Sequence, residues 1–269
     1  MKRLLIGITA FLAAAVALAQ GNPTPTQPAA PDTQSGYVSN MPDFGPVPEF
    51  ANESWLNTDV PLRLSNLRGK VVLLDMWTFE CINCIHITPY VESWYTKYAD
   101  QGLVVIGNHY PEFSAEHDIA NIRKALPDLG ITYAVTQDND GATWAAWANH
   151  YWPTIYLIDK QGHLRYTHIG EGGYDSSEAA IQDLLKETYT APAEASAAPD
   201  APKLHYLNPT TSVNVRASAG IDSNVIGSIE PGESFVIRSE ENGWYRIGYN
   251  DGDGFVSGDL VTVKDEPTI

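Results

Sequence analysis

The sequence predicts an α/β domain that is followed by a small all-β barrel. Residues 48–189 alternate short apolar runs with helical stretches, whereas residues 204–264 hold short β-rich runs between Gly, Asn and Asp turns. In addition, two cysteines separated by two residues directly follow an apolar run, an arrangement typical of a reactive site. With 269 residues, 43% of them hydrophobic, the chain is long enough for two modest domains.

The N-terminal residues predict a secretory signal peptide. Lys2 and Arg3 precede an apolar stretch that ends at Ala17–Ala19 in an A-x-A pattern, so we expect cleavage after Ala19. The stretch is shorter than the roughly 20 residues that span a bilayer, which disfavours a membrane anchor. We therefore expect a periplasmic or secreted protein in an oxidising compartment.

Two further segments are expected to lie outside the folded domains. Residues 20–47 are rich in Pro, Thr, Gln and Ala and predict a disordered leader. Residues 190–203 are mostly Ala and Pro and predict a semi-rigid linker between the domains.

The chain is strongly acidic, with a formal net charge of -17 at pH 7. Such a charge repels phosphate backbones and anionic membrane surfaces. We therefore expect no nucleic-acid partner.

The elements of the first domain are expected in a fixed order. Short apolar runs and alternating patterns indicate strands, longer runs with helical periodicity indicate helices, and a Gly-containing turn joins the last two strands into a hairpin. The predicted elements are a strand at 71–77, a helix at 84–99, a strand at 103–107, a helix at 115–126, a strand at 133–136, a helix at 143–151, strands at 154–159 and 164–168, and a helix at 177–187.

Cys81 and Cys84 are the only cysteines of the chain, and their spacing puts both sulfurs on the first turn of the first helix. A sulfur at a helix N-terminus meets unpaired backbone N–H groups and the positive end of the helix dipole, which favour the thiolate. We expect Cys81, the more exposed, to be the attacking nucleophile. Cys84 is expected to resolve the mixed disulfide.

A structural disulfide and a zinc site are the alternatives for this pair. A disulfide that closes so short a loop stabilises little. Zinc would need further ligands such as His86 or His109, and no second C-x-x-C or H-x-H pair supports them. The spacing favours redox chemistry, with no metal and no cofactor beyond the redox-active pair itself.

Asp75 lies on the strand before the cysteines. A carboxyl group there would be buried beneath the sulfurs with a raised pKa and could accept a proton from Cys84. The alternative is a strand-end aspartate that is hydrogen-bonded to the backbone. Trp77, on the same strand, is expected to pack beside the site rather than to react.

Pro153 follows Trp152 just before the hairpin. An X-Pro bond at this place is a candidate for the cis form, which would set a backbone edge beside the cysteines to receive a substrate strand. An ordinary trans proline at the start of the strand explains the same residues.

Taken together, these motifs resemble the thioredoxin superfamily and, within it, the DipZ/TlpA-like (redoxin) domains of exported bacterial proteins. The resemblance covers the whole first domain and implies a thioredoxin fold with an inserted strand and helix, the redox pair Cys81–Cys84, and Pro153 in cis. The motifs that carry it are Leu74–Cys84, Pro89–Val91, Tyr110–Phe113, Gln137–Asp140, Asn149–Pro153, Tyr156–Asp159 and Gly170–Gly172.

DipZ-type proteins carry a membrane electron-transfer domain before this module, and we find none in this sequence. We therefore expect an external electron-exchange partner, membrane-borne by analogy. Between the cysteines stand Ile82 and Asn83, neither the Gly-Pro of strong reductants nor the Pro-His of strong oxidants. Glu80, beside the nucleophile, would raise the pKa of Cys81 if its carboxylate is unpaired, which favours a reductase over an oxidase.

The second domain resembles a bacterial SH3 domain over about Leu204 to Val263, which implies a module that binds cell-wall peptides or proteins. Trp244 and Tyr245 could line its binding groove, although for Trp244 the barrel core is favoured. The carrying motifs are Val213–Ala217, Val225–Ile229, Gly232–Glu233, Gly243–Ile247 and Gly254–Ser257.

The sequence thus predicts an exported thiol–disulfide oxidoreductase, more a reductase than an oxidase, that acts on protein or peptide thiols and disulfides and is addressed by its SH3-like module. The alternative is a non-enzymatic envelope-binding protein in which the thioredoxin fold is a scaffold. A peroxidase is disfavoured, because no Arg lies near Cys81 in the sequence.

Overall fold

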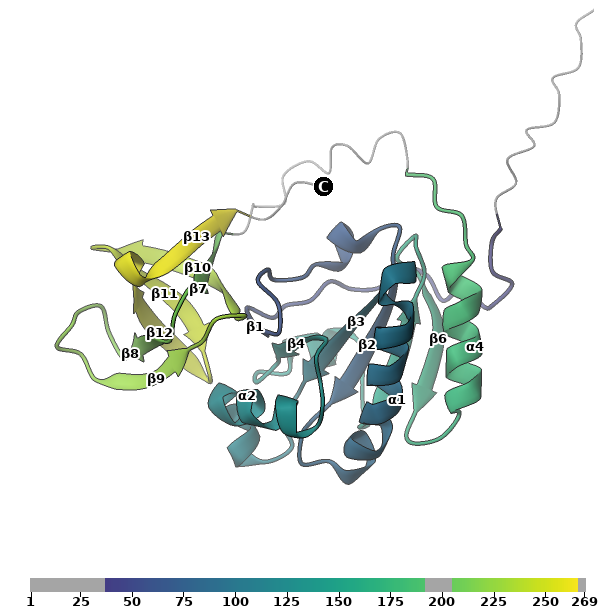
Figure 1. Cartoon of the computed structure of the whole chain (residues 1–269), viewed down its shortest axis with the longest axis horizontal. Helices are drawn as coiled ribbons and strands as arrows, with labels where there is room; N and C mark the ends of the chain where they lie inside the picture. The colour runs from purple at the N-terminus through teal and green to yellow at the C-terminus, as the bar shows by residue number, and fades with distance from the viewer. Residues whose placement is uncertain (1–36, 192–204, 266–269) are drawn as a thin grey trace, which may run out of the picture. The chain divides into compact units, whose positions relative to one another are not determined.

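A mixed sheet forms the centre of the first domain in the computed structural model, which describes residues 37–191 and 205–265 (Figure 1). β2 lies parallel to β3 on one side and antiparallel to β5 on the other, and the sheet continues through β4 and β6. β2 matches the predicted strand at both ends, because a run of Val and Leu that is buried on both faces is typical of a central strand. The bounds are β2 (Val71–Trp77), β3 (Leu103–His109), β4 (Ala134–Gln137), β5 (Thr154–Ile158) and β6 (Leu164–Ile169).

Each of the four predicted helices is present, although their ends differ from the prediction. α3 is shorter than expected, because the backbone turns left-handed at Ala148, where φ is 48°. α4 begins three residues early and is preceded by Gly173 in the left-handed conformation. The helices are α1 (Ile82–Tyr98), α2 (Ile119–Asp128), α3 (Ala142–Ala146) and α4 (Tyr174–Leu185), with 3-10 turns η1 (Leu64–Leu67), η2 (Ala99–Gln101), η3 (Ser114–His117) and η4 (Gly258–Leu260).

Two hydrophobic cores cover the two faces of the sheet. One face, with Leu73 and Val105, packs against apolar residues of α1, α2 and α4. The opposite face, with Leu74 and Ile106, packs against Trp55 and Trp147. Since side chains alternate along a strand, Asp75 and Trp77 share the face of Leu73, beneath α1. Figure 1 shows α1 and α4 side by side over β2 and β6.

The chain before β1 differs from the expected disordered leader over residues 37–47. Arg165, which is buried, donates to the carbonyl oxygens of Ser39 (2.9 Å) and Met41 (2.7 Å) and pairs with Asp159 (2.8 Å). A backbone hydrogen bond from Phe44 to Leu164 adds to this anchor. The composition hides such partners, because they lie more than 100 residues further along the chain. The expected signal peptide, the leader up to residue 36 and residues 192–203 of the linker lie outside the described residues.

The second domain is all-β, as predicted. β10, β11, β12, β8 and β9 pair in this order, while β7 pairs with β10 and β13. Trp244 differs from the expectation of a core residue: it is only partly buried, and so is Tyr245. The strands are β7 (His205–Pro209), β8 (Val213–Arg216), β9 (Val225–Ile229), β10 (Ser234–Glu241), β11 (Trp244–Tyr249), β12 (Gly252–Ser257) and β13 (Val261–Asp265).

A short strand that the sequence did not reveal, β1 (Ser54–Leu56), joins the two domains. Trp55 pairs with Thr136 of β4 on one side and with Ser234 of β10 on the other. As a result, residues 37–191 and 205–265 form one compact unit with a continuous strand order.

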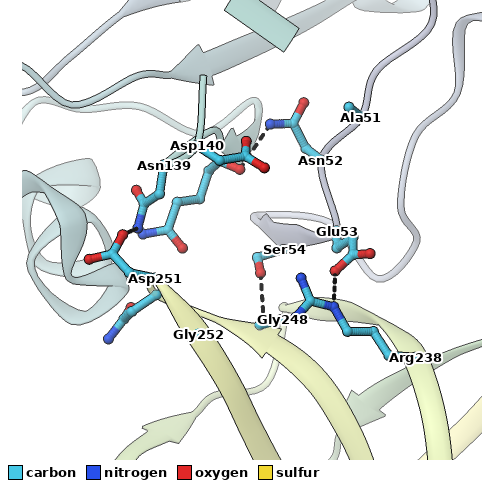
Figure 2. Close-up of a pocket in the computed structure, with 12 residues that line it drawn as sticks. Ala51, Asn52, Glu53, Ser54, Asn139, Asp140, Arg238, Gly248, Asp251 and Gly252 are labelled. Carbon is cyan, nitrogen blue, oxygen red and sulfur yellow. Dashed lines mark hydrogen bonds and ion pairs between the residues drawn. The ribbon is translucent and has the colours of Figure 1, made fainter. Parts of the chain in front are cut away.

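Side chains reinforce this junction and line a polar pocket of about 410 Å³ beside it. Ser54 donates to the carbonyl oxygen of Gly248 (3.1 Å), and Arg238 donates to Glu53 (2.6 Å), as Figure 2 shows. Within the described residues, no helix is both long and apolar enough to cross a membrane.

Candidate active site

Cys81 occupies the N-cap position of α1 and Cys84 lies within its first turn. Cys81 has extended backbone angles, φ -73° and ψ 111°, and its Sγ accepts a hydrogen bond from the backbone N–H of Cys84 at 3.3 Å. Cys84 is 1% exposed and belongs to the core beneath α1, whereas Cys81 is half-buried. The two sulfurs therefore differ in access, as the sequence predicted.

The surroundings also separate the acidities of the two thiols. Hydrogen bonds from the Cys84 side chain and from the backbone N–H groups of Cys84 and Asn83 outweigh burial and lower the pKa of Cys81 to about 7. The pKa of Cys84 is raised, first by its hydrogen bond to Cys81 and then by burial and the charge of Asp75. Near neutral pH, a large fraction of Cys81 is thus ionised to the thiolate, whereas Cys84 stays a thiol.

The pH dependence of Cys81 alkylation tests this assignment. Because only the thiolate reacts, the rate with iodoacetamide should rise through a midpoint near pH 7, about 1.5 units below an ordinary cysteine. Glu112, whose charge raises the pKa of Cys81, provides the matched change: Glu112→Gln should move the midpoint lower. A midpoint at or above pH 8.5 would contradict the assignment.

The effect predicted for the Glu80 carboxylate on Cys81 stays a prediction. The carboxylate of Glu112, on the loop after β3, raises the pKa of Cys81. Glu80 contributes through its backbone, which donates a hydrogen bond to Glu116 at 2.9 Å. Asn83 is exposed, and it too acts on Cys81 through its backbone.

Asp75 lies buried on β2, between Gly107 of β3 and Ile155 of β5 in the register of the sheet. It is 1% exposed, and its Oδ1 finds no hydrogen-bond partner among the described residues. Burial, together with the negative charge of Cys81, raises its pKa to about 8. This is the buried acid that the sequence predicted, and not the aspartate satisfied by backbone that was the alternative.

The Trp152–Pro153 peptide bond is cis, as the resemblance implied. Thr154 pairs with Met76, so Pro153 lies at the next register position, beside Trp77 at the end of β2 that leads to Cys81. Trp152 packs at the edge of the core that also contacts Cys81, and its indole donates to the carbonyl oxygen of Tyr110 at 3.2 Å.

Trp77 is a packing residue, as expected. It is 1% exposed and lies against Gly107, where an added Cβ would come within 2.6 Å of the indole nitrogen. Glycine is therefore required at position 107, directly beside Asp75 in the sheet.

Glu116 is a site residue that sequence reasoning missed. It is fully buried and accepts four hydrogen bonds, from the Thr78 hydroxyl and from the backbone N–H groups of Glu80 (2.9 Å), Glu112 (2.7 Å) and Phe113 (2.8 Å). Burial would raise its pKa, but these hydrogen bonds outweigh burial and lower it. One carboxylate thus fixes both loops that flank Cys81, and no local sequence signal marks it.

The two histidines considered as zinc ligands have other partners. His109 is fully buried, its Nε2 lies 3.1 Å from the Thr78 hydroxyl, and burial lowers its pKa to about 4. His86 lies on the surface, with Nδ1 3.1 Å from Glu171. Over residues 37–191 and 205–265, no three His, Cys, Asp or Glu side chains are grouped to hold a metal ion.

Comparisons with known proteins agree with this geometry. The AhpC/TSA family model matches residues 45–167, and the bacterial SH3 domain model matches residues 211–262. The crystal structure of the thioredoxin-like superfamily protein SPOA0173 is 27% identical with a TM-score of 0.51, over 54% of this chain and 99% of that one.

Two relatives have a higher sequence identity to this chain than that structure has. Protein DipZ of Mycobacterium tuberculosis is 41% identical over 166 residues, which cover 58% of this chain but only 24% of DipZ. The chain thus spans about a quarter of the length of that relative. The thiol-disulfide oxidoreductase YkuV of Bacillus subtilis is 33% identical over 144 residues, which cover 53% of this chain and 96% of YkuV.

The match to YkuV spans nearly all of that protein. The chain belongs to the thioredoxin-like thiol–disulfide oxidoreductases and carries a bacterial SH3 domain after the redox domain.

Proposed function

We propose that this enzyme is an exported thiol–disulfide reductase that acts on protein or peptide disulfides. The observation that carries the proposal is the arrangement at the start of α1. A half-buried Cys81 is backed by a buried Cys84, and the buried carboxyl group of Asp75, whose Oδ1 has no hydrogen-bond partner among the described residues, lies in the core.

In the first step the Cys81 thiolate attacks one sulfur of the substrate disulfide. A bond from Cys81 to that sulfur forms as the substrate S–S bond breaks, and the other substrate sulfur leaves as a thiolate. Cys84 then gives its proton to the Asp75 carboxylate and attacks Cys81 Sγ, which releases the second substrate thiolate. Two electrons have passed to the substrate, and Cys81–Cys84 is left as a disulfide.

The negative charge of Cys81 controls when the proton can pass from Cys84 to Asp75. In the free enzyme that charge helps to raise the pKa of Asp75. Once Cys81 is in a mixed disulfide the charge is gone, so the pKa of Asp75 falls and more of its carboxyl group is ionised. The base therefore becomes available at the step that needs it.

The proposed direction of electron flow is supported by the acidity of the Cys81 thiol. A Cys81 pKa of about 7 is close to that of thioredoxin and well above the roughly 3.5 of the oxidant DsbA. A less stabilised thiolate makes the disulfide harder to reduce, which favours a reductase. In an oxidising compartment the pair then needs an external dithiol, which we propose to be membrane-borne, to return it to the reduced form.

The bacterial SH3 domain is proposed to address the enzyme to cell-wall peptides or to a protein. Trp244 and Tyr245, both partly exposed at the start of β11, are the candidate contact residues. The acidic chain disfavours nucleic acid as a ligand.

The reduction potential of the Cys81–Cys84 couple tests the proposed direction. We expect a value near that of thioredoxin, about -270 mV, together with catalysed reduction of insulin by the dithiothreitol-charged enzyme. The matched control is Cys81→Ser, which should reduce insulin no faster than dithiothreitol alone. A potential near -120 mV would instead identify an oxidase.

A further inference from the structure

The tight turn between β11 and β12 of the SH3 domain reaches the redox domain at the start of α2. Asn250, whose φ is 52°, accepts the backbone N–H of Ile119 on its Oδ1 at 2.9 Å. The next residue, Asp251, lies with Oδ1 2.9 Å from Nδ1 of His117. The turn thus contacts both sides of the junction between η3 and α2.

Side chains from β4 and the loop after it hold the same junction. Asn139 donates to Asp251 at 3.0 Å, a contact drawn in Figure 2, and also to the carbonyl oxygen of His117 at 2.8 Å. Gln137 donates to that carbonyl oxygen as well, at 2.8 Å. His117 is therefore fixed through its ring by the SH3 domain and through its backbone by the redox domain.

The junction leads directly to the active site. Glu116 precedes His117 in η3, and its buried carboxylate holds the backbone of Glu80, the residue before Cys81, and that of the loop at 112–113. His117, which the turn holds, is thus the direct neighbour in sequence of Glu116, which holds the loop before Cys81. A displacement of His117 would also displace Glu116. The Glu116 side chain cannot rotate to absorb the movement, because four hydrogen bonds hold its carboxylate.

Contacts away from the turn also hold the SH3 domain against the redox domain. Arg123 of α2 donates to Glu233 at 3.0 Å and to the carbonyl oxygen of Ser228 at 2.9 Å, and Val236 of β10 donates to the carbonyl oxygen of Glu53 at 3.0 Å. Glu233 is 3% exposed, so this ion pair is shielded from solvent on the glutamate side. The SH3 domain is thereby held against α2 and against the residue before β1 at points other than the turn.

We infer that the Asn250–Asp251 turn is a positioning element of the redox site, which holds η3 so that Glu116 keeps the loop before Cys81 in its reactive conformation. The SH3 domain is then a working part of the enzyme, in addition to any ligand that it binds. This inference rests on the proposed role of Cys81 as the nucleophile.

Hydrogen exchange in the full chain tests the inference without any measurement of turnover. In Asn250→Ala/Asp251→Ala, the amides of Glu80, Glu112 and Phe113 should exchange about three- to tenfold faster, since the cap of Ile119 and the His117 contact are both lost. Alkylation of Cys81 at pH 7 should slow by a similar factor. Glu116→Gln is the positive reference and should affect the same three amides.

Three controls make the result specific. Asp265→Ala removes a comparable exposed contact, His205 Nδ1 to Asp265 Oδ1 at 2.7 Å, elsewhere in the SH3 domain and should change neither readout. Asp251→Asn keeps the acceptor oxygen and should stay close to the wild type. His117→Ala removes the contact from the other side, and combining it with Asp251→Ala should add little.

The inference fails if the turn variant leaves the three amides as protected as in the wild type, or if Asp265→Ala exposes them equally. If Asn250→Ala/Asp251→Ala unfolds the chain, His117→Ala alone is used, and the inference fails if this variant leaves the three amides as protected as in the wild type. A faster exchange in an enzyme that does not reduce insulin would support the inference and overturn the proposed function, so the two failures are distinguishable.

Discussion

Replacement of Cys84 by serine should stop turnover and leave Cys81 joined to its substrate in a stable mixed disulfide. The buried Cys84 thiol supplies the sulfur that releases the substrate, and a serine hydroxyl cannot form the internal disulfide. We expect insulin reduction to fall to the background rate. Mass spectrometry under non-reducing conditions should detect a one-to-one adduct on Cys81 with a peptide disulfide.

Two further variants separate the chemistry of Cys84 from its hydrogen bond. The Cys84 side chain is the largest cause of the low pKa of Cys81. A serine still donates a hydrogen bond to the Cys81 thiolate, so Cys84→Ser should keep the pKa of Cys81 lower than Cys84→Ala does. Cys81→Ser/Cys84→Ser should form no adduct. An adduct that Cys84→Ser resolves as fast as the wild type would contradict the assigned roles.

Asp75→Asn should stabilise the fold at neutral pH and slow the enzyme. The folded pKa of about 8 lies above the unfolded value, so between about pH 4 and pH 8 the folded state keeps a proton that the unfolded state releases. The stability of the wild type therefore falls as pH rises through this window. The free energy of unfolding of Asp75→Asn should exceed that of the wild type by an amount that grows with pH, at roughly 1.36 kcal/mol per pH unit. The difference should be negligible near pH 4 and reach on the order of 4 kcal/mol at pH 7.

The kinetic effect of the same substitution falls on the second step. Without a base behind Cys84, resolution of the mixed disulfide should slow about a hundredfold or more at pH 7, whereas formation of the mixed disulfide should change little. Urea unfolding at pH 4.5 and pH 7.5, with single-turnover release of a fluorescent peptide, measures both effects.

Asp138 provides the contrast for Asp75. It is also buried, but it accepts hydrogen bonds from Asn108 (3.0 Å) and from the backbone N–H groups of Thr143 (3.1 Å) and Trp144 (2.7 Å). Asp138→Asn places an N–H donor among these donors and should destabilise the fold. If Asp75→Asn is equally destabilising at pH 7.5, the assignment of Asp75 as an unpartnered buried acid is wrong.

The parts of the site that the sequence predicted are those set by local geometry. The spacing of Cys81 and Cys84 and the apolar run before them fix the sulfurs at a helix start, and the position of Asp75 on that run places its carboxyl group beneath them. The cis form of Pro153 was identified only through the resemblance, because the residues alone fit either isomer.

The parts that the sequence did not predict depend on contacts between distant residues. Glu116 is an ordinary glutamate until the fold brings it to the N–H groups of Glu80 and Phe113. Residues 37–47 have the composition of a disordered leader, and only the buried Arg165 gives them partners. β1 is too short for its alternation to be detected, and both of its neighbours lie far along the chain.

The position of β1 has a consequence for how the protein is made. A strand at the edge of a sheet offers unpaired N–H and C=O groups to any other extended chain, and β1 would be such an edge without β10. During synthesis, β1 is made long before β10, in which Phe235 pairs with Ser54, so the redox domain passes through a stage with an open edge. Arrival of the C-terminal domain ends that stage, which gives the domain a role in protecting the newly made enzyme from aggregation.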